Sequence, residues 1–140
     1  MNFFIKLKQF LIDRTESVSS VEKKINYIFH NKDYIRQAFT HKSLDTSPRK
    51  NYERLEFLGD SVLGLLVATE LFRRFPDSDE GSLTRCRANL VRQETLAFVA
   101  RKFGLGQLVV LGEGAARSGG SDRSSILADV MEAVIGAVYL

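Results

Sequence analysis

The stretch Asn51-Tyr-Glu-Arg-Leu-Glu-Phe-Leu-Gly-Asp-Ser-Val-Leu63 decides the fold of this 140-residue chain. On a helix each residue turns by about 100°, so Glu53, Glu56 and Asp60 fall within an arc of about 60° on one face. Apolar residues occupy most of the remaining positions as far as Leu66. A helix that is apolar nearly all round is expected to be buried. Three carboxylates on a buried helix are costly unless their charge is compensated.

A second stretch, Ser125-Ile-Leu-Ala-Asp-Val-Met-Glu-Ala-Val-Ile135, has the same character. Its two acids, Asp129 and Glu132, are three residues apart and share one helix face. If the two helices pack face to face, these acids meet Glu56 and Asp60, and like charges at that distance cannot all stay ionised unaided. A hard divalent cation with oxygen ligands resolves the repulsion. Mg²⁺ fits best, because it accepts a few carboxylates and keeps waters for chemistry.

Two other interpretations of these acids remain open. The first is a helical scaffold in which arginines pair with the acids structurally; the candidates are Arg54, Arg73, Arg85 and Arg87. The second is a purely structural Ca²⁺, although Ca²⁺ sites usually draw on loop carbonyls and these acids are expected on helices.

Outside these stretches the chain also predicts helices, with no alternation of period two that would indicate strands. The expected helices cover 51–75, capped by Asn51 and ended by Pro76; 81–91, capped by Asp79; 94–103, ended by Gly104; and 126–140, capped by Ser124 or Ser125. Apolar stripes at 21–29 and 35–39 predict two more, whereas 44–50 and 112–122 are expected to be loops. Residues 108–111 fit either a strand or the start of a helix. We therefore predict a single all-α domain at 21–140, preceded at 1–20 by an amphipathic helix and a linker.

Composition limits the class of protein further. Hydrophobic residues make up 44% and charged residues 26% of the chain, close to globular averages, which excludes wholesale disorder. The longest apolar run, 62–69, is far shorter than the ~20 residues that span a bilayer, and 1–11 lacks the pattern of a signal peptide, so we expect no membrane partner. A single cysteine, Cys86, cannot form an internal disulfide. A reducing, cytoplasmic compartment is therefore expected.

The charge is unevenly distributed. The net charge is +3, but residues 1–50 carry ten Lys and Arg against five Asp and Glu, while 51–140 carry ten against twelve. An acidic centre in a basic chain favours a cation site that faces an anionic substrate. Five arginines are candidates to contact phosphates of such a substrate: Arg85, Arg87, Arg92, Arg117 and Arg123. The last two lie in the glycine-rich segment before a helix N-terminus, which attracts anions. A solvated helix face and a surface loop remain the alternatives for these arginines.

Several motifs together resemble the ribonuclease III family. They are Ala38-Phe-Thr-His-Lys-Ser43, Glu53-Arg-Leu-Glu-Phe-Leu-Gly-Asp-Ser-Val-Leu63, Phe75-Pro-Asp-Ser-Asp-Glu-Gly81, Ser118-Gly-Gly120 and Ser125-Ile-Leu-Ala-Asp129. They occur in the family's order and the resemblance covers 21–140. It implies an all-α endonuclease domain that cleaves double-stranded RNA as a homodimer with Mg²⁺, for which Mn²⁺ can substitute. The products would carry 5′-phosphate and 3′-hydroxyl ends.

The resemblance also implies roles for individual residues. The metal ligands would be Glu56, Asp60, Asp129 and Glu132, of which Asp60 and Glu132 would be central to catalysis. Two further acids, Glu53 and Glu80, would support catalysis at the site. Phe57 would lie at the dimer contact. A catalytically inactive RNA- or ribosome-binding module of the same fold is the alternative. Such relatives would be expected to lose ligands, whereas all four are present here.

Three further features carry expectations. Gly59 lies mid-helix, where glycine costs about 1 kcal/mol relative to alanine, so another backbone or a ligand is expected to approach it closely. We interpret His41 as a structural hydrogen-bonding residue. The apolar stretch 133–140 shows no helix cap, so we expect a truncated domain, and no double-stranded-RNA-binding domain follows in this sequence although bacterial family members usually carry one.

Overall fold

The computed structural model describes residues 18–140, and the structural statements below refer to that part of the chain. The amphipathic helix expected at the N-terminus lies outside it. Residues 18–25 form a helix in which Val18 and Val21 are buried. Residues 18–20, which we assigned to the linker, therefore belong to a packed helix.

Helices dominate the described residues, as predicted. They are α2 (Lys32–Ala38), α3 (Glu53–Arg74), α4 (Glu80–Val91), α5 (Gln93–Lys102), α6 (Glu113–Arg117) and α7 (Ser124–Tyr139), with 3₁₀ turns η1 (Leu105–Leu108) and η2 (Gly120–Asp122). Extended pairing among residues 18–140 is limited to one isolated bridge between Thr40 and Val110. No described helix has the length and apolarity to cross a bilayer.

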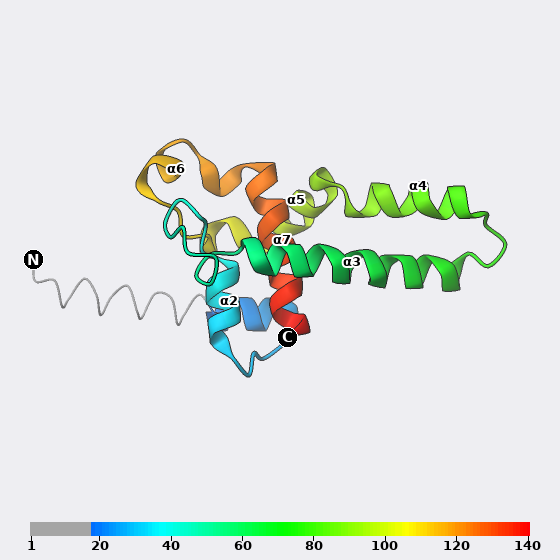
Figure 1. Ribbon diagram of the computed structural model, residues 1–140, viewed down its shortest axis with the longest axis horizontal. Helices are drawn as coiled ribbons and strands as arrows, with labels where there is room; N and C mark the ends of the chain where they lie inside the picture. Colours follow the sequence, from blue (N-terminus) through cyan, green and yellow to red (C-terminus); the bar gives the residue numbers. More distant parts are fainter. Residues whose placement is uncertain (1–17) are drawn as a thin grey trace, which may run out of the picture.

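The core surrounds α7, which is the most buried helix. Half of its sixteen residues are buried: Ile126, Leu127, Ala128, Val130, Ala133, Val134, Gly136 and Ala137. It packs chiefly on α3 and α5 and crosses α3 at a steep angle (Figure 1). The prediction of a core helix at this position is confirmed.

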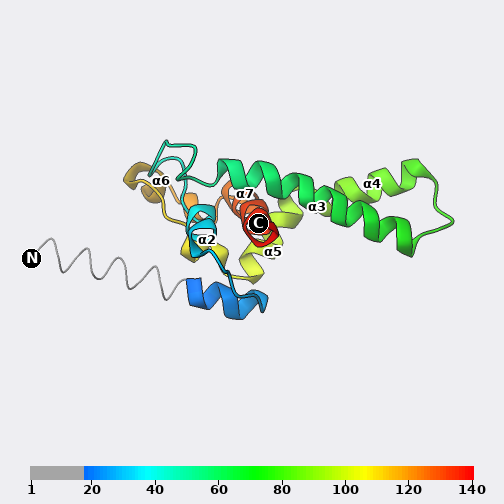
Figure 2. The same cartoon turned by 60° about the horizontal axis from the view of Figure 1, so that its bottom comes forward.

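The long helix α3 differs from its prediction. Its bounds agree within two residues, but only Leu55, Gly59 and Leu71 are buried along it. Its outer part extends beyond the body of the molecule, with α4 lying alongside, so the two form a projecting hairpin (Figures 1 and 2). The expectation that α3 is mostly buried is therefore wrong, because α4 covers only one side of this projecting part.

The helix caps follow the sequence in part. The Asp79 carboxylate accepts a hydrogen bond from the Ser82 backbone N–H at 2.9 Å, as predicted for the start of α4. Asn51 lies one residue before the cap position of α3, and its side chain accepts from the Glu53 N–H at 3.1 Å. The cap position of α7 is Arg123, which makes no side-chain cap, so Ser124 and Ser125 are inside the helix and the cap prediction there is wrong.

The loop expected at 112–122 contains the two short elements α6 and η2. Its glycine content favoured a loop, but Gly114 lies within α6, and Gly119 supplies the left-handed backbone, φ +73°, that joins α6 to η2. Gly104 has the left-handed conformation, φ +64°, directly after α5, as its predicted role required.

Candidate metal centre

The crossing of α3 and α7 brings their backbones into contact. A Cβ atom at Gly59 would lie 1.7 Å from the carbonyl oxygen of Glu132, and one at Gly136 would lie 2.4 Å from the carbonyl oxygen of Leu55. Only glycine fits at either position. The close approach predicted at Gly59 is therefore that of the α7 backbone, and it places Glu56 and Glu132 on adjoining turns of two helices.

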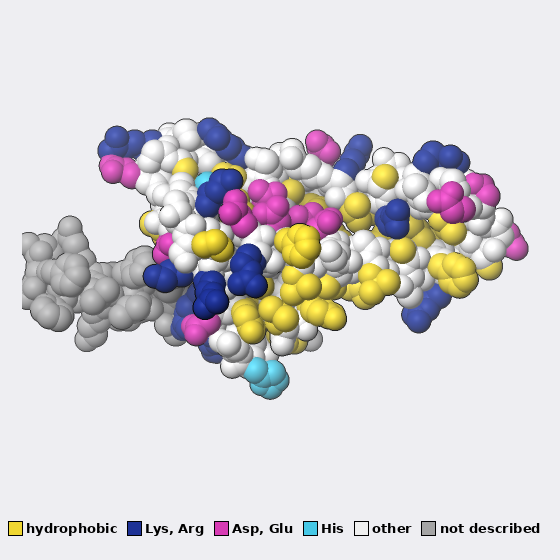
Figure 3. Space-filling view, viewed as in Figure 1, with side chains coloured by type: hydrophobic (Ala, Val, Ile, Leu, Met, Phe, Trp, Pro, Cys, Tyr) yellow, Lys and Arg dark blue, Asp and Glu magenta, His cyan; other side chains and the backbone are white. Residues whose placement is uncertain are grey.

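Three of the predicted acids meet at this crossing. Glu56, Asp129 and Glu132 each offer a carboxylate oxygen, and these oxygens all lie within 4.8 Å of one another. We call these three residues the acidic cluster. All three side chains are partly buried, and acidic side chains gather near the middle of one face of the molecule (Figure 3). Among residues 18–140 no ion pair reaches the acidic cluster, so the arginine-paired scaffold has no support in the described part of the chain.

Crowding and burial raise the pKa of each acid. Burial, together with the charges of Asp129 and Glu53, raises the pKa of Glu56 to about 7. Burial, together with the charges of Asp60 and Glu56, raises the pKa of Glu132 to about 7. Burial also raises the pKa of Asp129. The cluster therefore resists full ionisation, which is the condition that a bound cation relieves.

Asp60 stands apart from the other three predicted ligands. It is exposed, one turn beyond Glu56 on α3, and is not among the carboxylates whose oxygens lie within 4.8 Å of one another. Its charge still acts on the site, because it contributes to the raised pKa of Glu132.

The raised pKa values predict how stability depends on pH. Between about pH 4.5 and 7 the folded chain holds protons on Glu56 and Glu132 that the unfolded chain releases. The stability that these protons contribute is complete below about pH 4.5 and is lost as the pH rises through about 7. In EDTA, the melting temperature of wild type should therefore fall more than that of Glu132→Gln when the pH is raised from about 5 to 8. Thermal melts of both proteins would measure the difference; parallel pH profiles would contradict the raised pKa of Glu132.

A cleft of about 340 Å³ opens beside the acidic cluster. It is lined by His41, Lys42, Tyr52, Glu53, Glu56, Ala115, Arg123, Ser125, Ile126 and Asp129. Lys42 donates to a carboxylate oxygen of Glu53 at 2.9 Å, so Glu53 lies at the rim of the cleft in an ion pair with Lys42. His41 bonds through Nδ1 to the backbone and hydroxyl of Ser43, which confirms its hydrogen-bonding role.

Two predicted residues on the α3–α4 hairpin lie away from the cleft. Glu80 starts α4 and lines a groove with Ala68 and Phe72. Phe72 is sixteen residues beyond Glu56, or about 24 Å along the helix, so within a single chain the structure does not bring Glu80 to the acidic cluster. Phe57 also points away, and its side chain is 77% exposed.

The five arginines are spread over the molecule. Arg123 lines the cleft. Arg117 pairs with Glu113 on α6, and Arg85 and Arg87 lie on α4. Arg92 occupies the junction of α4 and α5. The structure therefore brings one of the five to the acids.

Sequence reasoning missed Tyr52. Its side chain is buried, and its hydroxyl donates to Asp129 at 3.3 Å. It is the residue directly before α3, between two polar residues, so no helical periodicity identifies it. The available signal was its place next to the first acid of the long helix.

Crossing core helices and a half-buried carboxylate cluster define a helical domain with a candidate oxygen-ligand metal centre. Residues 31–140 match the model of the Ribonuclease-III-like family. The nuclease domain of ribonuclease III from Campylobacter jejuni is similar in structure, with a TM-score of 0.84 and 39% identity over 87% of this chain and 84% of that one. That structure is described as showing flexibility in a region involved in dimer formation. The chain belongs to the ribonuclease III family.

Similar full-length proteins are longer. Ribonuclease 3 of Actinobacillus pleuropneumoniae serotype 3 is 53% identical over 120 residues, which are 86% of this chain and 52% of that protein. Ribonuclease 3 of Dechloromonas aromatica is 53% identical over 121 residues, 86% of this chain and 53% of that protein. The chain spans about half the length of these curated relatives.

Proposed function

We propose that this chain is an endonuclease domain that cleaves double-stranded RNA with a divalent cation in the cytoplasm, leaving 5′-phosphate and 3′-hydroxyl ends. The observation that carries the proposal is the acidic cluster, whose three carboxylates converge and form no ion pair among residues 18–140. Family membership supports it, since the similar proteins above are named as ribonucleases.

The donor set fits Mg²⁺ or Mn²⁺. Glu56, Asp129 and Glu132 offer only oxygen ligands. Burial raises the pKa of all three, and neighbouring carboxylates raise the pKa of Glu56 and Glu132 further. Asp60, one turn further along α3, would be a fourth ligand, since its charge acts on Glu132. When bound, the cation supplies an activated water and polarises the phosphoryl oxygens. The chain's part is to hold the carboxylates at one point, while Glu53 is held at the cleft rim by Lys42.

Basic residues beside the cleft support an RNA substrate. Arg123 lines the cleft itself, and Arg117 lies on the neighbouring α6. Phosphates and 2′-hydroxyls of an A-form duplex are the features that such side chains reach, because the deep major groove excludes them. Arg85, Arg87 and Arg92 would meet RNA only where the duplex also follows the α3–α4 hairpin.

A cleavage assay tests the function. The full chain is incubated with a labelled RNA duplex and Mg²⁺. A phosphatase should then release phosphate from the 5′ ends of the products, and the 3′ ends should carry the free hydroxyl that ligation requires. The same RNA as a single strand, and the duplex in EDTA, should remain intact. Duplex binding without any cutting would instead favour the inactive RNA-binding module.

The same chain is proposed to act as a homodimer through α3. Phe57, Leu65 and Phe72 fall within an arc of about 80° on this helix, and their side chains are 77%, 68% and 74% exposed. We call these three residues the α3 apolar face. A monomer rarely leaves such a row in water, and a two-fold axis beside it would place two acidic clusters across one duplex.

Phe57→Ala should weaken this association. Losing a buried aromatic anchor costs about 2 kcal/mol, and a two-fold dimer loses one from each protomer, so the dimer dissociation constant should rise by roughly several hundredfold. Sedimentation equilibrium measures it, and duplex cleavage should fall in parallel. Ile28→Ala is the matched control, because Ile28 is 74% exposed but lies outside α3. Equal self-association of wild type and Phe57→Ala would contradict the assigned face.

A further inference from the structure

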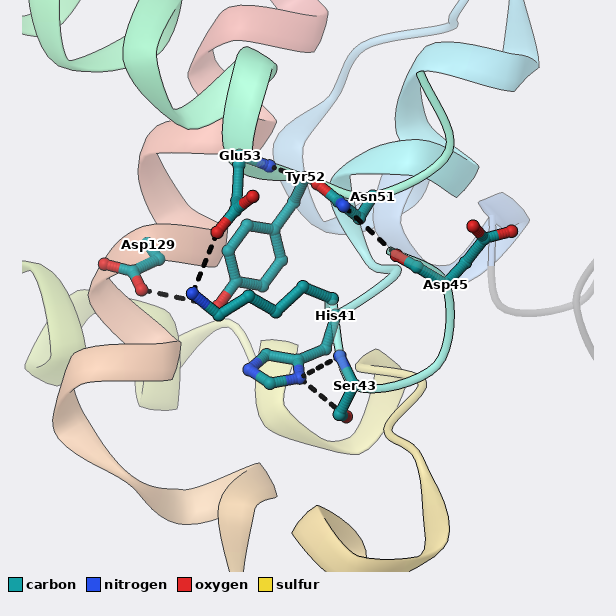
Figure 4. A network of polar contacts seen from close by, with 8 residues as sticks. His41, Ser43, Asp45, Asn51, Tyr52, Glu53 and Asp129 are labelled. Atoms are coloured by element: carbon teal, nitrogen blue, oxygen red, sulfur yellow. Dashed lines mark hydrogen bonds and ion pairs between the residues drawn. The ribbon is translucent and has the colours of Figure 1, made fainter. Parts of the chain in front are cut away.

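The buried tyrosine at the start of α3 connects the two helices of the acidic cluster. Tyr52 is 3% exposed, and Figure 4 shows its side chain reaching toward Asp129 on α7. Its hydroxyl donates to Oδ2 of Asp129 at 3.3 Å, a contact between residues 77 positions apart in the chain. Tyr52 is thus the residue whose side chain joins the start of α3 to a member of the cluster on α7.

The backbone of Tyr52 is fixed on both sides. Its N–H donates to the carbonyl of Thr40 at 2.9 Å, and its carbonyl accepts from the N–H of Glu56 at 2.9 Å. The second of these bonds belongs to the first turn of α3, which carries Glu56. The position of the tyrosine is therefore set by the same turn that places a member of the cluster.

The ring of Tyr52 is fixed by a second set of contacts. It meets the ring of His41 edge to face, with centroids 5.5 Å apart. His41 is itself held by Ser43, whose N–H donates to Nδ1 at 3.0 Å (Figure 4). The Ser43 hydroxyl in turn accepts from the N–H of Gly112 at 2.9 Å. Because the ring has little freedom to turn, its hydroxyl is held in one direction before any ligand arrives.

A hydrogen bond to one carboxylate oxygen restricts rotation of the whole group. The Tyr52 bond occupies Oδ2 of Asp129, so we expect Oδ1 to be the oxygen offered to a ligand. Carboxylates that bind cations are commonly oriented in this way by a neighbouring donor, and removing such a donor typically weakens metal affinity or activity by about 10–100-fold.

We propose that Tyr52 is a positioning residue for the metal centre, which orients the Asp129 carboxylate through its hydroxyl. This rests on the proposed function, in that the acidic cluster must bind a divalent cation. The hydroxyl touches neither RNA nor cation; it acts through Asp129, and His41 acts one step further out by holding the ring.

Calorimetric titration of the full chain with Mn²⁺ alone tests the role. Tyr52→Phe keeps the buried ring and removes only the hydroxyl, so the Mn²⁺ dissociation constant should rise by about tenfold or more. The melting temperature in EDTA should change little by comparison. Tyr27→Phe is the matched control, because its hydroxyl also bonds across the fold, to the carbonyl of Val138 at 3.5 Å, away from the acids. It should bind Mn²⁺ as wild type does.

A purely structural tyrosine gives a different result. In that case Tyr52→Phe lowers the melting temperature yet binds Mn²⁺ with wild-type affinity, which overturns the proposal. A double-mutant cycle adds a second measurement: in an Asp129→Asn background, Tyr52→Phe should no longer change Mn²⁺ affinity. A full additional loss there also overturns it. A wild-type chain that binds no Mn²⁺ overturns the proposed function, and the positioning role with it.

Discussion

Glu132→Gln should bind duplex RNA but fail to cut it. The amide has the shape of the protonated acid, so the packing of α7 is preserved while a negative charge and a ligand oxygen are lost. Removing a ligand should cost more than the ~100-fold that loss of a supporting residue can cost. The melting temperature in EDTA should not fall, because the charges of Asp60 and Glu56 no longer oppose a carboxylate at this position.

Single-turnover cleavage and a filter-binding titration, run on the same duplex, separate the two effects. Glu70→Gln is the control: it removes a carboxylate from α3 that is exposed and paired with Arg74, outside the acidic cluster. It should cut at the wild-type rate. If Glu132→Gln cuts within about tenfold of wild type in Mg²⁺, Glu132 is not a ligand.

Gly59→Ala should unfold far more readily than wild type. The added methyl group would lie 1.7 Å from the carbonyl oxygen of Glu132 and 2.5 Å from its carbon, so α3 and α7 must separate. Alanine gains about 1 kcal/mol from helix propensity, but forcing apart two packed backbones costs more than the ~3 kcal/mol of ordinary overpacking. We expect a net loss of at least about 2 kcal/mol in the free energy of unfolding.

Urea denaturation measures this loss. Gly114→Ala is the control, because Gly114 is also helical and nothing lies within 4 Å of its Cβ position. It should be as stable as wild type or slightly more so. Since the crossing also sets Glu56 against Glu132, Gly59→Ala should bind Mn²⁺ weakly even when folded. Wild-type stability in Gly59→Ala would contradict the role assigned to the crossing.

Much of the fold could be predicted because its signals are local. Pro76 directly follows Phe75, the C-cap residue of α3, and Asp79 caps α4 through its own side chain. The spacing of Asp129 and Glu132 on an apolar helix placed both acids on one face, and the structure confirms that they meet Glu56.

The predictions that were wrong or missing depend on tertiary packing, which a local sequence pattern does not encode. An all-round apolar helix looks the same whether its own chain or another copy covers it, so the exposure of Leu65 and Phe72 could not be predicted. Asp60 shares a face with Glu56 on α3, yet the steep crossing brings Asp129 and Glu132 to Glu56 and leaves Asp60 outside the cluster. Tyr52 acts across 77 residues of chain, which is a tertiary contact.

The central claim is that Glu56, Asp129 and Glu132 together hold a divalent cation. Anomalous diffraction from a crystal of the chain soaked in Mn²⁺ tests it most directly. We predict an anomalous peak at the crossing of α3 and α7, within about 2.0–2.2 Å of a carboxylate oxygen from each of the three residues. A crystal that shows Mn²⁺ bound elsewhere and no peak at these carboxylates would contradict the account.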